Sequence, residues 1–469
     1  MEGKRLLKKT GLYFIGNISS KILTFILVPI YALYIKSEDL GYYDYTQTVM
    51  NIAVPIFFVA IWEAILKFVL QEDNYEKKEK VLATSALFTI IMSIVTAFAA
   101  IIYNLAASEP FTHIHYVVLM IISYAVMFIW QYYARSLEEN KIYVLTGMLG
   151  TTVNFLANII MIFVFHLSID TLFVSYILGN ISIAVILEAK LGILKRINKK
   201  NLDIKVLKKM LFFSAPLVLN LISTWLLSGF GRMIINDRFG NYHNGLYAFA
   251  NRFAIVITML GSVINMAIIE EALISAKKEG IGKGFTDTIE TLFRLFQSMI
   301  IAAAPLITIF YFVIKLIKKD TDFYDSVFYF PGLLLYSLFM IMTTSFGTVF
   351  QVINKTKYQF ITTAIGAAAT VIISYATIEK FSLHGIIAAQ IIGSMVMLLS
   401  RYIFINKYIS FTINWLPIII LLSVYCILSV ICLYSNITVV CLLSVTSIIA
   451  MAYINRSFIK NFINIIKKH

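Results

Sequence analysis

The sequence predicts an all-α polytopic membrane protein with about 14 transmembrane helices. Of its 469 residues, 60% are hydrophobic and only 14% are charged, and the mean hydropathy is +0.84. Soluble domains have about 25% charged residues and about 45–50% apolar ones. Apolar runs of about 20 residues, the length that crosses a bilayer as a helix, recur along the whole chain.

Charged or turn-rich breaks separate these apolar runs. The basic segment at residues 1–9 leads directly into the first run, which is longer than the roughly 7–15-residue core of a signal peptide, so we expect no cleaved leader. The second and eighth spans are long enough to begin outside the bilayer. The predicted spans lie near residues 10–35, 43–70, 82–105, 116–137, 143–166, 171–193, 210–235, 245–274, 289–314, 329–352, 358–378, 385–405, 414–434 and 437–455.

The net charge of +14 follows from topology. With the N-terminus in the cytoplasm, most of the 39 Lys and Arg residues fall in the inner segments and few fall in the outer loops. This is the positive-inside distribution of a multi-pass membrane protein, and it places both termini in the cytoplasm. The basic composition therefore does not call for a nucleic-acid partner.

An internal repeat predicts two six-helix halves. The stretch GYYDY at residues 41–45 is matched by GLYAF at residues 245–249, and NKIY at residues 140–143 by NKTKY at residues 354–358. Six is even, so the halves have the same orientation and are related by a pseudo-two-fold axis along the membrane normal, as in several transporters. The predicted parts are an N-terminal lobe (1–200), a C-terminal lobe (201–408), and an extra helix pair with a basic tail (409–469).

Five basic residues lie inside predicted spans. A Lys or Arg near the bilayer centre costs about 2.5–3.5 kcal/mol on insertion scales, so each one needs a water-filled cavity or a partner charge. A cavity lined with cations favours an anionic cargo. The five residues are Lys21, Lys67, Arg232, Arg252 and Arg294.

Polar stripes accompany three of these cations. Residues spaced by three and four positions share one face of a helix, and lipid cannot satisfy a polar face, so such a stripe should face the protein interior or a lumen. The stripes are Asn17, Ser20, Lys21 and Thr24 in the first span, Asn220, Ser223, Thr224, Ser228 and Arg232 in the seventh, and Asn251, Thr258, Ser262 and Asn265 beside Arg252 in the eighth.

Two of the cations also have purely structural explanations. Lys67 lies about one turn from the end of its span, where it could snorkel to the interface or pair with Glu63 four residues earlier. Arg294 is near the inner end of the ninth span, where it could also snorkel. Lys21 and Arg232, each on a polar stripe in the first helix of its half, therefore form the core of the predicted site.

The sequence contains no catalytic motif of the common kinds. It has neither H-E-x-x-H nor G-x-S-x-G, and the glycines at residues 280–284 lack the spacing of a phosphate-binding loop. The three cysteines show no metal-ligand spacing. We therefore expect no enzymatic activity, no cofactor and no metal, and transport driven by an ion gradient, the membrane potential or consumption of the product.

Several segments resemble the Wzx-type polysaccharide flippases of the multidrug/oligosaccharidyl-lipid/polysaccharide exporter (MOP) superfamily. They are residues 9–29, residues 40–44, Pro216, Gly231-Arg232 and residues 245–247. The resemblance covers nearly the whole chain through diffuse motifs. Its one clear departure is at Gly231, because the family usually has an Asp before the arginine of the seventh helix.

The resemblance implies two six-helix lobes around a central cavity, two additional C-terminal helices, and alternating access. It implies a monomer that moves an undecaprenyl-diphosphate-linked oligosaccharide from the inner to the outer leaflet of the bacterial cytoplasmic membrane, for surface polysaccharide synthesis. The implied partners are that glycan lipid, membrane lipid, a polysaccharide polymerase and other assembly proteins. Lys21, Arg232 and Arg252 would meet the diphosphate, and Asn and Ser side chains of the stripes would bind sugar hydroxyls.

Three other functions remain alternatives. A lipid II flippase is a close relative with a similar cargo. A drug/cation antiporter of the same superfamily should line its cavity with carboxylates, whereas the clearly mid-span ionisable residue here is Lys21. A membrane polysaccharide polymerase or glycosyltransferase should carry catalytic outer loops, and the outer loops of this chain are short.

Overall fold

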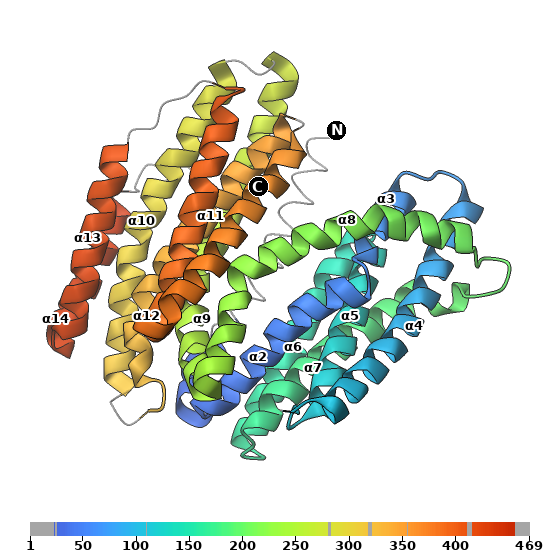
Figure 1. Ribbon diagram of the computed structural model, residues 1–469, viewed down its shortest axis with the longest axis horizontal. Helices are drawn as coiled ribbons and strands as arrows, with labels where there is room; N and C mark the ends of the chain where they lie inside the picture. Colours follow the sequence, from blue (N-terminus) through green and yellow to red (C-terminus); the bar gives the residue numbers. More distant parts are fainter. Residues whose placement is uncertain are drawn as a thin grey trace. The chain divides into compact units, whose positions relative to one another are not determined.

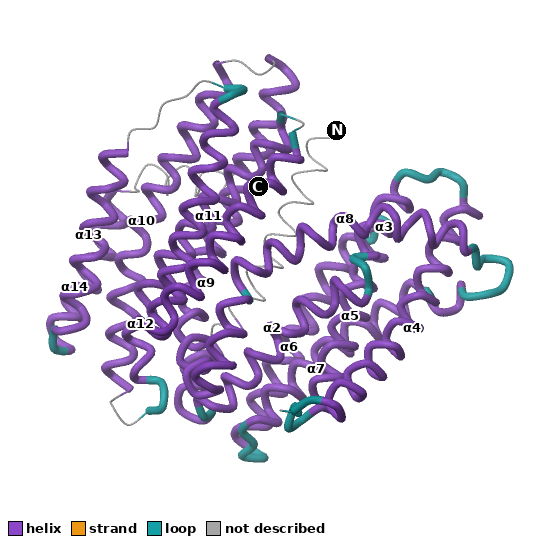
Figure 2. The backbone as a smooth tube through the Cα atoms, in the orientation of Figure 1, coloured by secondary structure: helices purple, strands orange, loops and turns teal. Residues whose placement is uncertain are grey.

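The chain divides into two compact units, Met1–Trp225 and Leu226–His469, called here the first and the second unit. The computed structural model describes residues 23, 26–108, 110–279, 283–317, 321–353, 355–409 and 415–454, and the regular elements in these ranges are all helices (Figures 1 and 2). The predicted lobe boundaries near residues 200 and 408 stay predictions.

The first unit, blue to green in Figure 1, is a bundle in which α5 has a central position. Helix α5 packs against α2, α3, α4, α6 and α7, and α6 and α7 form the most extensive helix pair of this unit. The helices are α2 (Ser37–Phe57), α3 (Ile61–Leu70), α4 (Tyr75–Ala106), α5 (Ile114–Ser136), α6 (Asn140–Phe163), α7 (Ile169–Leu191), the 3₁₀ turn η1 (Leu194–Arg196) and α8 (Ile204–Ser228), whose last residues belong to the second unit.

The second predicted span is broken rather than continuous. Helices α2 and α3 meet at a bend of 53°. Pro55 lies in the last turn of α2, and Val59 and Ala60 both have positive φ, at 50° and 45°. A proline lacks an amide hydrogen and weakens the turn before it, and the left-handed backbone at Val59 and Ala60 then ends the helix. The span predicted at residues 43–70 is therefore bent into two helices, α2 and α3.

The second unit, yellow-green to red in Figure 1, is organised around α9, which packs against α10, α11 and α12. Helix α10 also packs against α13 and α14, so the last helix pair is attached to this unit through α10. The elements are α9 (Phe230–Glu279), α10 (Lys283–Ile317), the 3₁₀ turn η2 (Tyr324–Phe328), α11 (Phe330–Val352), α12 (Thr356–Asn406), α13 (Trp415–Tyr434) and α14 (Ile437–Ile454).

Two long helices of the second unit each consist of two arms. Helix α9 is interrupted at Gly240 (φ 79°, ψ 178°), a conformation that is essentially restricted to glycine. Helix α12 is interrupted at Ser382 (φ 49°, ψ −132°), in agreement with the predicted break between the eleventh and twelfth spans. The seventh predicted span, residues 210–235, is instead divided between α8, which ends at Ser228, and the first arm of α9.

In each unit, two glycines on neighbouring helical segments face one another across a close backbone contact. In the first unit a Cβ atom on Gly179 would lie 2.9 Å from the carbonyl oxygen of Gly150, between α6 and α7. In the second unit a Cβ atom on Gly393 would lie 3.0 Å from the carbonyl oxygen of Gly366, between the two arms of α12. Small residues allow such close backbone contact between membrane helices.

Helix length and composition identify a multi-pass membrane protein. Within the described ranges, nine helices are long and apolar enough to cross a membrane, and a tenth passes if α2 and α3 count as one bent span. Helix α14 is apolar but shorter. The predicted all-helical fold class is confirmed.

Candidate functional site

The polar stripe of the first predicted span lies outside the described residues. It comprises Asn17, Ser20, Lys21 and Thr24. Their part in a site stays a prediction.

Arg232 is the best-defined of the predicted cations. It is half-buried in the first arm of α9, and its guanidinium carbon lies 5.6 Å from the ring centre of Tyr247 in the second arm. This is within the range of a cation–π interaction, which contributes about 0.5–2 kcal/mol depending on desolvation. The structure thus brings Arg232 together with the tyrosine of the second repeat motif.

The hydroxyl of Tyr247 is held by Gln390. The hydroxyl of Tyr247 donates to Oε1 of Gln390 over 2.9 Å, and the two side chains are 1% and 0% exposed. Gln390 lies in the second arm of α12. Gln390 was not among the predicted site residues, because a single glutamine in an apolar run does not form a polar stripe.

The glycine that departs from the flippase pattern lies where α12 approaches α9. A Cβ atom on Gly231 would lie 2.7 Å from Cγ2 of Ile386 and 3.2 Å from Nε2 of Gln390. The first of these distances is too short for any side chain without a shift of the neighbouring helix. An aspartate before Arg232 therefore does not fit this packing, which explains the departure.

Asn251 and Arg252 are neighbours in the second arm of α9. Asn251 is buried and Arg252 is half-buried. Successive helical residues point about 100° apart, so the two side chains leave the helix on different faces. Of the other predicted members of this stripe, Thr258 donates to the carbonyl of Ile255 in its own helix, and the side chains of Ser262 and Asn265 lie outside the described residues.

Asn220 and Ser223 lie in α8, in the part that belongs to the first unit, and both are half-buried. The hydroxyl of Ser223 donates to the carbonyl of Leu219 over 2.9 Å, so it is satisfied within its own helix. Because α8 ends at Ser228, the stripe predicted from Asn220 to Arg232 is not one continuous helical face. That prediction was wrong in its geometry.

Lys67 is exposed at the C-terminal end of α3, and its ammonium lies 3.9 Å from the ring centre of Phe213. The carboxylate of Glu63 instead accepts a hydrogen bond from the hydroxyl of Tyr132 over 3.3 Å. In the described part of the chain no ion pair joins Glu63 to Lys67, so the pairing considered from the sequence is not formed. Arg294 is exposed on α10.

A further buried cation, near the end of the span predicted at residues 385–405, was not among the predicted site residues. Arg401 lies inside α12 and is 4% exposed. Its guanidinium donates to the hydroxyls of Thr362 over 3.2 Å and Thr363 over 2.9 Å, and to the carbonyl of Thr343. It therefore joins α11 to both arms of α12.

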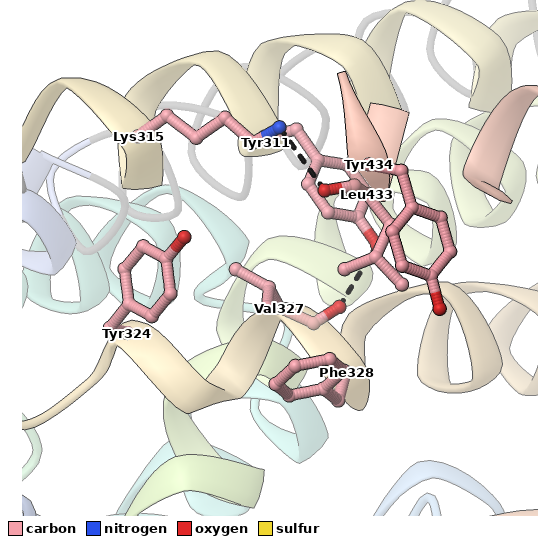
Figure 3. Close-up of a pocket in the computed structure, with 7 residues that line it drawn as sticks. All are labelled: Tyr311, Lys315, Tyr324, Val327, Phe328, Leu433 and Tyr434. Carbon is pink, nitrogen blue, oxygen red and sulfur yellow. Dashed lines mark hydrogen bonds between the residues drawn. The ribbon is translucent and has the colours of Figure 1, made fainter. Parts of the chain in front are cut away.

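Lys315 was assigned to a loop, but it lies in the last turn of α10. Its ammonium donates to the carbonyls of Cys432 (2.7 Å), Leu433 (3.3 Å) and Ser435, at the C-terminal end of α13. The unsatisfied carbonyls of a helix end carry partial negative charge, so a cation stabilises them. Lys315 borders a cavity of about 260 Å³ (Figure 3), whose other lining residues are Tyr311, Tyr324, Val327, Phe328, Leu433 and Tyr434.

A hydrogen bond joins the turn at Gly240 to the segment before α11. The hydroxyl of Tyr242 donates to the carbonyl of Asp322 over 3.3 Å. Burial, and then the carboxylates of Asp325 and Asp322, raises the pKa of Tyr242. Tyr242 therefore stays a neutral donor at physiological pH.

The sequence matches a known protein family, and the fold is similar to solved structures. Residues 6–269, more than half of the chain, match the model of the polysaccharide biosynthesis protein family. No curated protein matches the sequence. The fold is similar to three solved transporters, each of which is less than 25% identical to this chain.

An inward-facing multidrug resistance MATE family transporter of the MOP superfamily has a TM-score of 0.65 at 13% identity, over 85% of this chain and 95% of that one. The lipid II flippase MurJ, in an inward closed conformation, has a TM-score of 0.62 at 15% identity, over 96% and 99%. A MOP superfamily transporter from Pyrococcus furiosus has a TM-score of 0.57 at 14% identity, over 85% and 95%.

Proposed function

Because the chain belongs to the polysaccharide biosynthesis protein family, we propose that it is a flippase for an undecaprenyl-diphosphate-linked oligosaccharide. It moves this lipid from the inner to the outer leaflet of the bacterial cytoplasmic membrane, where the glycan is used for surface polysaccharide synthesis. The family match and a fold similar to that of MOP superfamily transporters support this proposal.

The observation that carries the proposal is the placement of Arg232. Its half-buried guanidinium lies against an aromatic ring in a multi-pass membrane protein. A planar guanidinium binds phosphate oxygens in a bidentate manner, which suits a diphosphate. In our proposal Lys21 and Arg252 share this role, and Lys67 and Arg294 complete the set of substrate-binding cations.

The polar residues of the predicted stripes have a second role in this proposal. Their amides and hydroxyls would bind the hydroxyl groups of the sugar. These residues are Asn17, Ser20, Thr24, Asn220, Ser223 and Asn251.

Transport would follow from alternating access between an N-terminal lobe and a C-terminal lobe. In this mechanism both termini are cytoplasmic, the monomer is the working unit, and no step needs catalysis, a cofactor or a metal. A polysaccharide polymerase and other assembly proteins would take the glycan after it reaches the outer leaflet.

The test is complementation of a deletion strain with variants of the two central cations. We expect Lys21→Ala and Arg232→Ala to abolish surface polysaccharide while membrane abundance, measured by immunoblot, stays normal. Lipid-linked oligosaccharide should accumulate on the cytoplasmic side. Normal surface polysaccharide with both variants would overturn the cationic site.

Lipid II transport is the second candidate, favoured by a fold similarity that covers 96% of this chain and 99% of the lipid II flippase. The two cargoes are separated by a second complementation experiment, in cells depleted of their lipid II flippase. Growth of those cells with this protein would favour lipid II as the cargo. Increased drug resistance with normal polysaccharide in the deletion strain would instead favour an antiporter.

A further inference from the structure

We infer that Gln390 and Tyr247 are positioning residues that hold the guanidinium of Arg232 ready to bind a phosphate group. The inference rests on the proposed function, because it assigns Arg232 to an anionic substrate. Neither Gln390 nor Tyr247 is expected to touch the substrate. Both act through Arg232, and both were absent from the site predicted from the sequence.

The orientation of the Tyr247 ring is fixed by its surroundings. Tyr247 is 1% exposed and Gln390 is 0% exposed, and the 2.9 Å bond between hydroxyl and amide oxygen joins α9 to α12. A buried tyrosine hydroxyl needs a partner, and here one acceptor supplies it. The bond therefore fixes the orientation of the Tyr247 side chain.

The second feature is the contact between that ring and the cation. Arg232 lies 5.6 Å from the ring centre, and the attraction comes from the negative face of the ring. The Tyr247 hydroxyl donates its hydrogen to the neutral amide of Gln390. The ring therefore keeps its electron density, and its hydrogen-bond partner adds no charge near Arg232. A guanidinium held in advance loses less conformational freedom when it binds a phosphate.

The side-chain amide nitrogen of Gln390, Nε2, is the third feature that supports the inference. This nitrogen is buried, and no residue in the described ranges accepts its hydrogens. It lies 3.2 Å from the Cβ position of Gly231, next to Arg232 in the chain. A buried donor without a partner is costly, so a Leu or Met would be the more stable choice at this position for packing alone. The amide therefore has a role other than packing.

The experiment measures binding of undecaprenyl diphosphate to the purified full-length protein in detergent. Tyr247→Phe keeps the ring and removes the bond to Gln390, and Gln390→Leu removes the same bond from the other side. We expect each to weaken binding about fivefold, the effect of one lost hydrogen bond. The control is Tyr311→Phe, which removes a buried hydroxyl bond to the carbonyl of Val327 (3.0 Å) in the same unit and should not change binding.

The variant Gln390→Glu separates charge from shape. A carboxylate is nearly isosteric with the amide and can still accept the hydrogen bond from Tyr247. Burial raises the pKa of a carboxyl, so binding is measured up to high pH, where the ionised carboxylate adds a negative charge beside the ring that contacts Arg232 and affinity for the diphosphate should fall at least as far as with Gln390→Leu. Unchanged binding by Gln390→Glu would contradict the inference. The thermal midpoint of each variant confirms that it is folded.

A double-mutant cycle distinguishes positioning from a general structural role. In an Arg232→Gln background, Tyr247→Phe should cause no further loss, since it acts only through the arginine. An additive loss would overturn the inference. If Arg232→Gln itself binds normally, the proposed anion site fails. If Arg232→Gln loses binding while Tyr247→Phe and Gln390→Leu bind normally, the positioning role fails and the proposed function stands.

Discussion

The crossing of α6 and α7 in the first unit and the crossing of the two arms of α12 in the second unit are built in the same way. In each, two glycines face one another, and a Cβ atom on either glycine would lie 2.9 Å (first unit) or 3.0 Å (second unit) from the carbonyl oxygen of the other. Four residues beyond the second glycine, a large apolar side chain covers the first: Ile183 covers Gly150 and Met397 covers Gly366.

The two crossings differ one turn further along each helix. Eight residues after the first glycine, the first unit has Asn158 in a hydrogen-bond network, and the second has Ser374, whose hydroxyl has no partner in the described ranges. Eight residues after the second glycine, the first unit has a buried Leu187 and the second has the buried cation Arg401. The repeated feature is thus the close backbone contact, and the polar interactions around it are specific to each unit.

The largest expected effect comes from the glycines themselves. Gly179→Ala and Gly393→Ala each force a methyl group against a backbone carbonyl, so the helices must separate. We expect each to lower stability by about 1–3 kcal/mol, as for other overpacked interiors. The measurement is the midpoint of thermal unfolding of the purified protein in detergent.

A glycine of α6, the helix that α7 crosses, provides the control. A Cβ atom on Gly147, in α6, would meet only Nε2 of Gln131 at 3.8 Å. Gly147→Ala should therefore be neutral or stabilising, because alanine has the higher helix propensity. If Gly179→Ala lowers stability and Gly393→Ala does not, the two crossings do not depend on glycine in the same way and are not equivalent.

The next effect tests the polar position that follows the first glycine. Asn158 accepts from the hydroxyl of Tyr31 over 2.8 Å and donates to Ser175 over 2.7 Å, so Asn158→Ala removes two buried hydrogen bonds. We expect a loss of roughly 1–2 kcal/mol, within the range of buried hydrogen bonds in membrane proteins. Ser374→Ala removes an unpaired hydroxyl and should change stability by less than about 0.5 kcal/mol. Equal losses in the same unfolding measurement would show that Ser374 has a partner of comparable value.

Periodicity and charge predicted much of this architecture from the sequence. Apolar runs are long enough to mark most spans, while the two halves predicted from the repeat of GYYDY by GLYAF stay a prediction. The paired glycines were not predicted, because their meaning depends on which helices cross and not on local spacing. The breaks at Gly229 and at Val59–Ala60 were missed for a similar reason, since both lie inside continuous apolar runs.

The candidate site was harder to predict than the fold. Arg232 was identified because a cation in an apolar run is conspicuous, but its aromatic partner Tyr247, and the partner of that tyrosine, Gln390, come from other helical arms. Arg401 was not singled out because it lies near the end of the span predicted at residues 385–405, where a polar segment follows. Which cations are buried depends on where a helix ends, and composition defines helix ends poorly.

The last comparison concerns Arg401, where Leu187 occupies the matching position of the first unit. The hydroxyls of Thr362 and Thr363 already donate to carbonyls in their own helix, at 2.8 Å each, so removing the guanidinium leaves no donor unpaired. Replacing a buried charge by an apolar residue of similar size is often neutral or stabilising, so Arg401→Met should change stability by less than about 1 kcal/mol.

Arg401→Lys is the contrasting variant, because it retains the buried charge but cannot reproduce the planar set of donors that reaches three helical segments. We expect it to lower stability by about 1–3 kcal/mol in the same unfolding measurement, as a buried cation without its full set of partners. This order, with methionine tolerated and lysine not, would mean that the second unit folds as the first does without the cation. If Arg401→Met is the more damaging variant, the guanidinium itself holds α11 to the arms of α12, and the two crossings are stabilised by different means.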